Sequence, residues 1–220
     1  MAPQIKTFYS YFRSSTAYRL RIALALKGVT PQETCYVNLL KGEQHSEEYR
    51  QVNPAAAVPA FELEDGMVLT QSLAMLEWLE EVYPQPTLLP VDNILRAKVR
   101  AFADVVATDM HPVNNLRILH YLTNELNVPE EAKMQWMHHW MRKGFAVLES
   151  MIAAEKGKFC FGDTPTLADI CLVPQIYNAL RFEVKITTYP RLMAVYSHAS
   201  QHPAFAQAAP ELQPDCPSPT

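Results

Sequence analysis

The sequence lacks several features that would indicate a membrane or nucleic-acid partner. No apolar run approaches the roughly 20 residues that a helix needs to cross a bilayer. There is no basic stripe or tail, because 19 Lys and Arg stand against 23 Asp and Glu and leave a formal net charge of −4. Electrostatics therefore give no reason to expect nucleic acid or an anionic membrane as partner.

Cysteine is scarce, and its spacing carries no metal or redox motif. The four cysteines show no C-x-x-C spacing and form no ligand pattern with the histidines, so we expect no metal site. The first six residues show no signal-peptide pattern, because strand-like sequence begins at once. These absences predict a reducing, cytoplasmic location with free thiols. Each cysteine is interpreted as a small apolar residue: Cys35, Cys160, Cys171 and Cys216.

What is present is an ordinary globular composition arranged in two halves of different texture. The chain has 220 residues, of which 49% are hydrophobic and 19% charged, enough for a sizeable core. Residues 5–82 mix short strand-like runs with helical patterns, whereas residues 92–202 are almost entirely helical in pattern. Three prolines within residues 83–90 indicate a linker between them.

The first half predicts a small sheet with helices packed on it. Alternation, cap residues and the Asp-Gly pair at Asp65 give the order β-α-β, then a hairpin, then α. The expected strands are 6–11, 34–38, 60–63 and 68–70, and the expected helices are 17–27 and 72–81.

The second half predicts four helices. The long pattern over 94–121 contains Pro112, which should kink it. The others are 130–154, then 167–180 behind a capping box formed by Thr166 and Asp169, and 189–200 behind a capping Thr188. The polar, proline-rich residues 210–220 are expected to lie extended on the surface.

Three short motifs carry possible chemistry. Ser14, Ser15 and Thr16 open a helix, whose N-terminus stabilises an anion such as a thiolate; the alternative is simple N-capping. Val58, before Pro59, would offer its backbone to an extended peptide if that bond were cis; the alternative is an ordinary trans proline. Gln71 and Ser72 open another helix and suit a carboxylate, or are again only a cap.

The three motifs in this order, followed by a proline linker and an all-helical half, resemble the glutathione transferases over nearly the whole chain. Residues 9–24 resemble the zeta class, whose signature is Ser-Ser-Cys-x-Trp-Arg-Val-Arg-Ile-Ala-Leu. Thr16 and Tyr18 stand where that signature has Cys and Trp. Asn53-Pro54 and the stretch from Phe161 to Asp169 also match the family pattern.

The resemblance implies a fold of two domains and a glutathione cofactor. It implies a thioredoxin-like α/β domain over 1–83, a linker over 84–91 and an all-helical substrate-binding domain over 92–220. Of the catalytic turn, Ser14 would hydrogen-bond the glutathione sulfur, with Ser15 and Thr16 supporting it. The other implied cofactor-binding residues are Gln44, Val58, Gln71, Ser72 and His111. A homodimer is expected on resemblance alone.

The implied reaction is cis–trans isomerisation of a maleyl acid, in which glutathione thiolate adds to the double bond, rotation follows and the thiolate leaves. The candidate residues for the substrate's carboxylates and developing charge are Arg13, His111, Asn115, Arg117 and Arg181. On an ideal helix His111 and Asn115 share a face, whereas Arg117 lies on another unless the kink redirects it. Singly, Arg117 could pair with a surface acid and His111 could be an ordinary helix histidine.

Several alternatives stay open at this point. Maleylacetoacetate is the first-choice substrate, which would place the enzyme in aromatic amino acid catabolism, and maleylpyruvate is the second. A general conjugating or dehalogenating transferase would use the same thiol site. A non-catalytic binding protein is ranked below these, because such proteins tend to lose the thiol-activating hydroxyl, and Ser14 is present.

Overall fold

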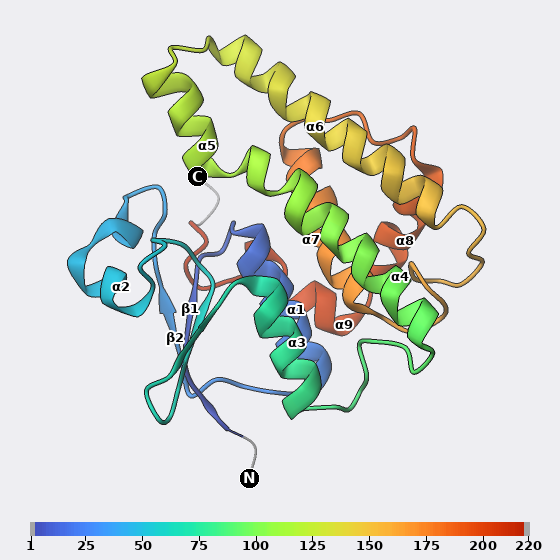
Figure 1. The fold of residues 1–220 in the computed structure, drawn as a ribbon, viewed down its shortest axis with the longest axis horizontal. Helices are drawn as coiled ribbons and strands as arrows, with labels where there is room; N and C mark the ends of the chain where they lie inside the picture. Colours follow the sequence, from blue (N-terminus) through green and yellow to red (C-terminus); the bar gives the residue numbers. More distant parts are fainter. Residues whose placement is uncertain (1–2, 218–220) are drawn as a thin grey trace. The chain divides into compact units, whose positions relative to one another are not determined.

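The computed structural model describes residues 3–217, which divide into two compact units. The first unit contains the chain up to Thr87 together with the residues from His202 onward, and the second contains Leu88–Gln201. A small four-stranded sheet lies in the first unit, and the second is helical (Figure 1). The α/β-plus-helical fold class is therefore confirmed.

The sheet of the first unit has the strand order β2-β1-β3-β4. β1 pairs with β2 in parallel and with β3 antiparallel, and β3 and β4 form the hairpin predicted at Asp65. In Figure 1, α1 and α3 lie on one side of the sheet and α2 on the other. The elements are β1 (Ile5–Ser10), α1 (Ser15–Lys27), β2 (Glu33–Tyr36), a 3₁₀ turn (Glu43–His45), α2 (Glu47–Val52), β3 (Ala60–Leu63), β4 (Val68–Thr70) and α3 (Ser72–Val82).

Residues 202–217 belong to the first unit, where α1 contacts them. The Tyr18 hydroxyl donates to the Phe205 carbonyl at 3.4 Å, and the buried Arg21 Nε donates to the Ala208 carbonyl at 2.9 Å. This segment contains α9 (Pro203–Gln207) and a 3₁₀ turn (Pro210–Leu212), neither of which the sequence analysis predicted. The expected extended tail is therefore wrong for residues 210–217, and residues 218–220 lie outside the described part. The predicted domain boundaries stay a prediction.

The second unit contains five α-helices, of which α5 is short, together with π-helical and 3₁₀ stretches. The α-helices are α4 (Asn93–Asp104), α5 (Leu116–His120), α6 (Glu130–Met151), α7 (Leu167–Arg181) and α8 (Pro190–Ala199). The capping box before α7 is confirmed: Asp169 accepts from the Thr166 backbone and hydroxyl and from the Cys160 N–H. Tyr189, and not the predicted Thr188, precedes the first turn of α8.

The single kinked helix expected over 94–121 is wrong in detail. After α4 the chain passes through a π-helical stretch, Val105–Met110, and a 3₁₀ turn, Pro112–Asn114. It then becomes extended at Asn115 (φ −70°, ψ 147°) before α5 begins. The Trp136 Nε1 of α6 donates to the Val113 carbonyl at 2.8 Å, and so satisfies a backbone group that the break leaves without a helical partner.

Residues 3–217 contain neither a membrane-spanning helix nor a metal-ligand cluster. None of their helices combines the length and apolar character that a bilayer span requires. None of their His, Cys, Asp and Glu side chains form a group of three or more that could hold a metal ion.

Candidate functional site

The turn between β1 and α1 carries Ser14 as the N-cap of the helix. Its backbone is extended (φ −67°, ψ 115°), and its Oγ accepts a hydrogen bond from the Ala17 N–H at 3.2 Å. The capping interpretation is therefore correct for the described structure. It does not compete with a ligand role, because the same hydroxyl keeps a proton to donate and lies at the positive end of a 13-residue helix.

Thr16 connects this turn to the loop that carries Val58. The Thr16 hydroxyl donates to the Val58 carbonyl at 3.1 Å, and the Ser14 and Thr16 hydroxyl oxygens lie 2.9 Å apart. Since the one Thr16 proton is directed at Val58, the proton between the two hydroxyls comes from Ser14. These two hydrogen bonds join the Ser14 turn to Val58, and so connect two of the three predicted motifs. They pass through Thr16, the residue that departs from the zeta signature. The Val58-Pro59 bond is cis.

The third motif forms the start of α3. Gln71 has φ 66° and is exposed, and its side chain makes no capping hydrogen bond to any described residue. A positive φ at a residue other than glycine is costly and concentrates at binding sites. Ser72 is buried and its Oγ accepts from the Nη1 of the buried Arg19 at 3.1 Å, which ties the start of α3 to α1.

Gln44 lies in the 3₁₀ turn before α2. Its side chain is buried, yet its Oε1 has no hydrogen-bond partner within residues 3–217. A buried amide oxygen without a partner is unfavourable, and a donor from a ligand would satisfy it. This fits the predicted role near the glycine end of glutathione, which stays a prediction.

The electrostatics of the first unit favour an anionic ligand at its helix starts. Neither α1 nor α3 has an acidic residue in its first turn, so the partial positive charge at each N-terminus is not offset locally. Arg13 is half-buried beside the turn, with its guanidinium carbon 5.2 Å from the centre of the Phe12 ring.

Two of the chain's four cysteine thiols have raised pKa values. Burial, followed by the charges of Glu33 and Glu43, raises the pKa of the Cys35 thiol. Burial, followed by the charge of Asp169, raises the pKa of the Cys160 thiol well above its ordinary value. Because the thiolate is the nucleophilic form, neither of these two cysteines has the low-pKa character of a catalytic thiol.

The second unit brings two of the predicted substrate residues together at the helix break. The His111 Nε2 and the Asn115 Nδ2 lie 3.2 Å apart. This pairing was predicted from an ideal helix, but it arises differently, because Asn115 is the N-cap of α5 and its Oδ1 accepts from the Arg117 N–H at 3.1 Å.

The two candidate arginines of the second unit are both exposed. Arg117 occupies the second position of α5, so the angle of about 240° calculated for a continuous helix does not apply to it. Arg181 ends α7, with its guanidinium carbon 4.3 Å from the centre of the Phe182 ring. Their roles on substrate carboxylates stay predictions.

Sequence reasoning missed the side chains that hold these segments in place. Arg21 and Trp136 bind backbone carbonyls of the turn and of the helix break, and the His138 Nε2 lies 2.7 Å from the Phe182 carbonyl beside Arg181. Trp136, His138 and Trp140 all lie on α6. The two Trp rings do contact each other, with centroids 5.8 Å apart. No local signal in the sequence indicates hydrogen bonds between such distant residues.

Comparison with known proteins identifies the class of this fold and site. Residues 13–82 match the glutathione S-transferase N-terminal domain, and residues 114–207 match the glutathione S-transferase C-terminal domain. The chain belongs to the glutathione S-transferase family.

Within this family the chain is similar to isomerases of maleyl acids. It is 46% identical over 209 residues to a probable maleylacetoacetate isomerase of Vibrio cholerae, covering 94% of this chain and 96% of that protein. It is also 46% identical to a maleylpyruvate isomerase of a Ralstonia species, covering 94% and 98%. Both comparisons extend over both halves of the chain.

Solved structures agree with this placement. A holo structure of a bacterial zeta-class maleylpyruvate isomerase superposes with a TM-score of 0.93 at 45% identity, covering 96% of this chain and all of that one. A maleylacetoacetate isomerase of Methylobacterium extorquens with bound malonate and glutathione gives a TM-score of 0.92 at 35% identity, covering 96% and 100%. The predicted zeta-like fold is confirmed.

Proposed function

We propose that this protein is a glutathione-dependent cis–trans isomerase of maleyl acids, with maleylacetoacetate as the first-choice substrate. The observation that carries the proposal is the Ser14 hydroxyl at the start of α1, in a chain related along its length to such isomerases. When bound, glutathione supplies the thiolate that adds reversibly to the substrate's double bond and so permits rotation.

The first unit holds and activates the cofactor in this proposal. Ser14 turns its proton from Thr16 toward the glutathione sulfur, and that hydrogen bond together with the start of α1 lowers the thiol pKa. Ser15 and Thr16 support the turn, and Thr16 keeps Val58 close to it. Gln71 and Ser72 receive the γ-glutamyl end at the start of α3, Gln44 the glycine end, and Val58 the cysteinyl backbone.

The substrate's carboxylates are bound by arginine in this proposal. Arg117 and Arg181 are exposed and carry planar guanidinium groups, which grip a carboxylate with two parallel hydrogen bonds. His111 and Asn115 form a hydrogen-bonded pair that can donate where negative charge develops. Arg13, next to the Ser14 turn, is proposed for a carboxylate near the reacting carbon, and His111 for cofactor contact as well.

The experiment is a comparison of isomerisation rates with and without the protein. The purified protein is incubated with glutathione and maleylacetoacetate or maleylpyruvate, and the fumaryl product is followed. We expect turnover of both maleyl acids, with a higher kcat/KM for maleylacetoacetate. A rate no faster than glutathione alone with either acid contradicts the proposal. A higher value for maleylpyruvate reverses only the order of substrates.

The rival functions give different results in parallel assays. A general transferase or dehalogenase would turn over conjugation substrates or small α-halo acids faster than maleyl acids. A non-catalytic binding protein would turn over neither maleyl acids nor conjugation substrates, whether or not it binds glutathione. The Ser14 hydroxyl favours the enzyme, because it supplies the group that thiol activation needs.

Three finer features form part of the proposal. All four cysteines are free thiols, which supports a reducing cytoplasm. The substrate preference supports a role in aromatic amino acid catabolism, and the relationship to glutathione transferases supports a homodimer. Light scattering tests the dimer directly, and a monomeric mass at assay concentration would contradict it.

A further inference from the structure

The turn that carries Ser14 begins where the sheet ends, so its backbone needs other partners. β1 ends at Ser10, and the following two residues have no partners in the ladder. The Phe12 N–H instead donates to the Asp215 Oδ2 at 2.8 Å, across 203 residues of sequence. The hydrogen bond is charge-assisted, because its acceptor is a carboxylate.

The same turn is held from its other side by Arg21. This buried guanidinium donates through Nη2 to the Phe12 carbonyl at 2.9 Å and through Nη1 to the Tyr11 carbonyl at 3.4 Å. Its Nε donates to the Ala208 carbonyl at 2.9 Å. Arg21 therefore joins the turn to the C-terminal segment, defined here as residues 202–217, and Asp215 adds a second connection.

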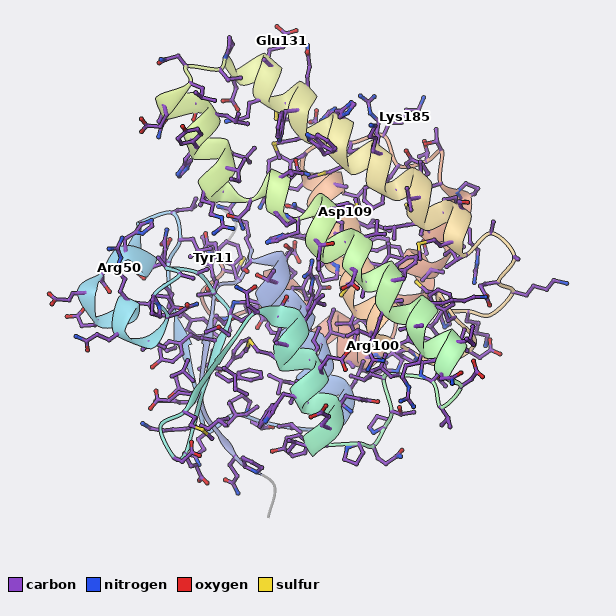
Figure 2. The ribbon with its side chains drawn as sticks, viewed as in Figure 1. Tyr11, Arg50, Arg100, Asp109, Glu131 and Lys185 are labelled. Atoms are coloured by element: carbon purple, nitrogen blue, oxygen red, sulfur yellow. The ribbon has the colours of Figure 1, made fainter. Side chains whose placement is uncertain are left out.

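Apolar packing supports the same arrangement. Tyr11, Phe12 and Val58 belong to one buried cluster with Val37 and Tyr49, and Cys216 packs against it. Tyr11 lies between α2 and the start of α1 in Figure 2. The C-terminal segment thus contacts the turn that precedes Ser14, and it packs against the buried cluster to which Val58 also belongs.

We propose that the C-terminal segment positions the thiol-activating turn, with Asp215 and Arg21 as positioning residues; this rests on the proposed function. Phe12 lies two residues before Ser14, and the Ser14 N–H donates to the Tyr11 carbonyl at 3.0 Å. The hydrogen bonds to the backbone N–H and carbonyl of Phe12 therefore fix the orientation of the Ser14 hydroxyl at the start of α1. An activating hydrogen bond depends steeply on that direction.

The test compares three variants of the full-length protein. Asp215→Ala removes the acceptor, and Asp215→Asn keeps an oxygen that can accept from Phe12 without the charge. Asp65→Ala is the matched control, because Asp65 also accepts a backbone N–H, that of Met67 at 3.0 Å, but at the exposed β3–β4 hairpin. The readouts are the pKa of the bound glutathione thiol, followed by thiolate absorbance against pH, and kcat/KM for the maleyl acid.

We expect Asp215→Ala to raise the pKa of the bound thiol and to lower kcat/KM at neutral pH about three- to tenfold, the size of one lost hydrogen bond. Asp215→Asn should keep the thiol pKa and kcat/KM close to their wild-type values, and Asp65→Ala should change neither quantity. A lowered Tm in Asp215→Ala with an unchanged thiol pKa would overturn the inference, since it is what a merely structural contact gives. If the wild-type protein binds no glutathione, the proposed function is overturned as well. If the wild-type protein is active, a negative result with the Asp215 variants overturns this inference alone.

Discussion

Two segments of this protein carry its proposed chemistry, and the sequence predicts them unequally well. The Ser14 turn has the conformation that its own residues indicate, an extended N-cap followed by a helix. The segment from His111 to Arg117 does not, because the expected kinked helix is interrupted and restarts at Asn115. His111 and Asn115 lie close together both in the predicted continuous helix and in the structure, but in the structure Asn115 is the N-cap of α5.

The difference lies in the range of the interactions that determine the backbone conformation at Ser14 and at Asn115, although the position of the Ser14 turn also depends on the distant Asp215. Ser14 caps α1 through Ala17, three residues away, so a short pattern is sufficient to predict it. The break at Asn115 combines a local cap with the bond from Trp136, 21 residues further along the chain. A proline pattern alone cannot reveal that partner. The predictions below test this contrast from the largest expected effect to the smallest.

The largest effect is expected for Ser14→Ala. Removing the hydroxyl that donates to the thiolate should lower kcat/KM about 100-fold, by analogy with the loss of one oxyanion donor. Loss of the cap should cost only about 1 kcal/mol of unfolding free energy. Thr16→Val serves as control, since it removes the neighbouring hydroxyl and leaves Ser14 in place. Steady-state kinetics and urea unfolding give both quantities, and a Thr16→Val loss as large as that of Ser14→Ala would argue against Ser14 as the principal donor.

Arg117→Ala should separate the two segments functionally. We expect the KM for the maleyl acid to rise about tenfold or more, because a bidentate carboxylate contact is lost. The Kd for glutathione, measured by calorimetry, should stay within about twofold of wild type, one RT unit or less. Arg142→Ala, another exposed arginine of the second unit, is the control. Equal losses in substrate and glutathione affinity would contradict the assignment.

Trp136→Phe should weaken the helix break without touching the Ser14 turn. Phenylalanine keeps an aromatic ring, although a smaller one than indole, and loses the hydrogen bond to the Val113 carbonyl. This loss should cost about 1–2 kcal/mol of unfolding free energy. We expect a rise of a few-fold in KM for the maleyl acid, because Asn115 and Arg117 directly follow the break that this hydrogen bond holds. Glutathione affinity should not change. Trp140→Phe is the matched control, and an equal effect there would assign the change to ring packing and not to the hydrogen bond.

The smallest effect is expected for Pro112→Ala. Pro112 opens the 3₁₀ turn, but the extended residue that ends the helix is Asn115, three positions later. If the Asn115 cap and the Trp136 contact maintain the break, alanine should leave helical circular dichroism and KM unchanged. A gain in helicity together with a changed KM would show that proline alone interrupts the helix.

The sequence was sufficient for the local features and insufficient for the long-range ones. The hairpin at Asp65, the capping box of Thr166 and Asp169, and the Ser14 cap all follow from residues within a few positions of one another. The return of the C-terminal segment to α1 could not be predicted, because it depends on a buried arginine, Arg21, that binds a carbonyl 187 residues away.

The β3–β4 hairpin and the α/β-plus-helical fold class were anticipated by pattern and resemblance, but the supporting contacts were not. Trp136 on Val113, Arg21 on Ala208 and Asp215 on Phe12 each join residues at least 23 positions apart. Backbone carbonyls and N–H groups are present at every residue, so a side chain that binds one leaves no compositional signal. Such contacts are visible only once the fold is known.

The central claim is that the Ser14 turn makes a bound glutathione thiol reactive. Titration of thiolate absorbance against pH in the protein–glutathione complex measures this directly. We expect the pKa of the bound thiol in wild type to lie about one unit or more below that of free glutathione, a tenfold or greater gain in the ionisation constant. Ser14→Ala should return most of this shift. A bound thiol in wild type with the pKa of free glutathione would contradict the account.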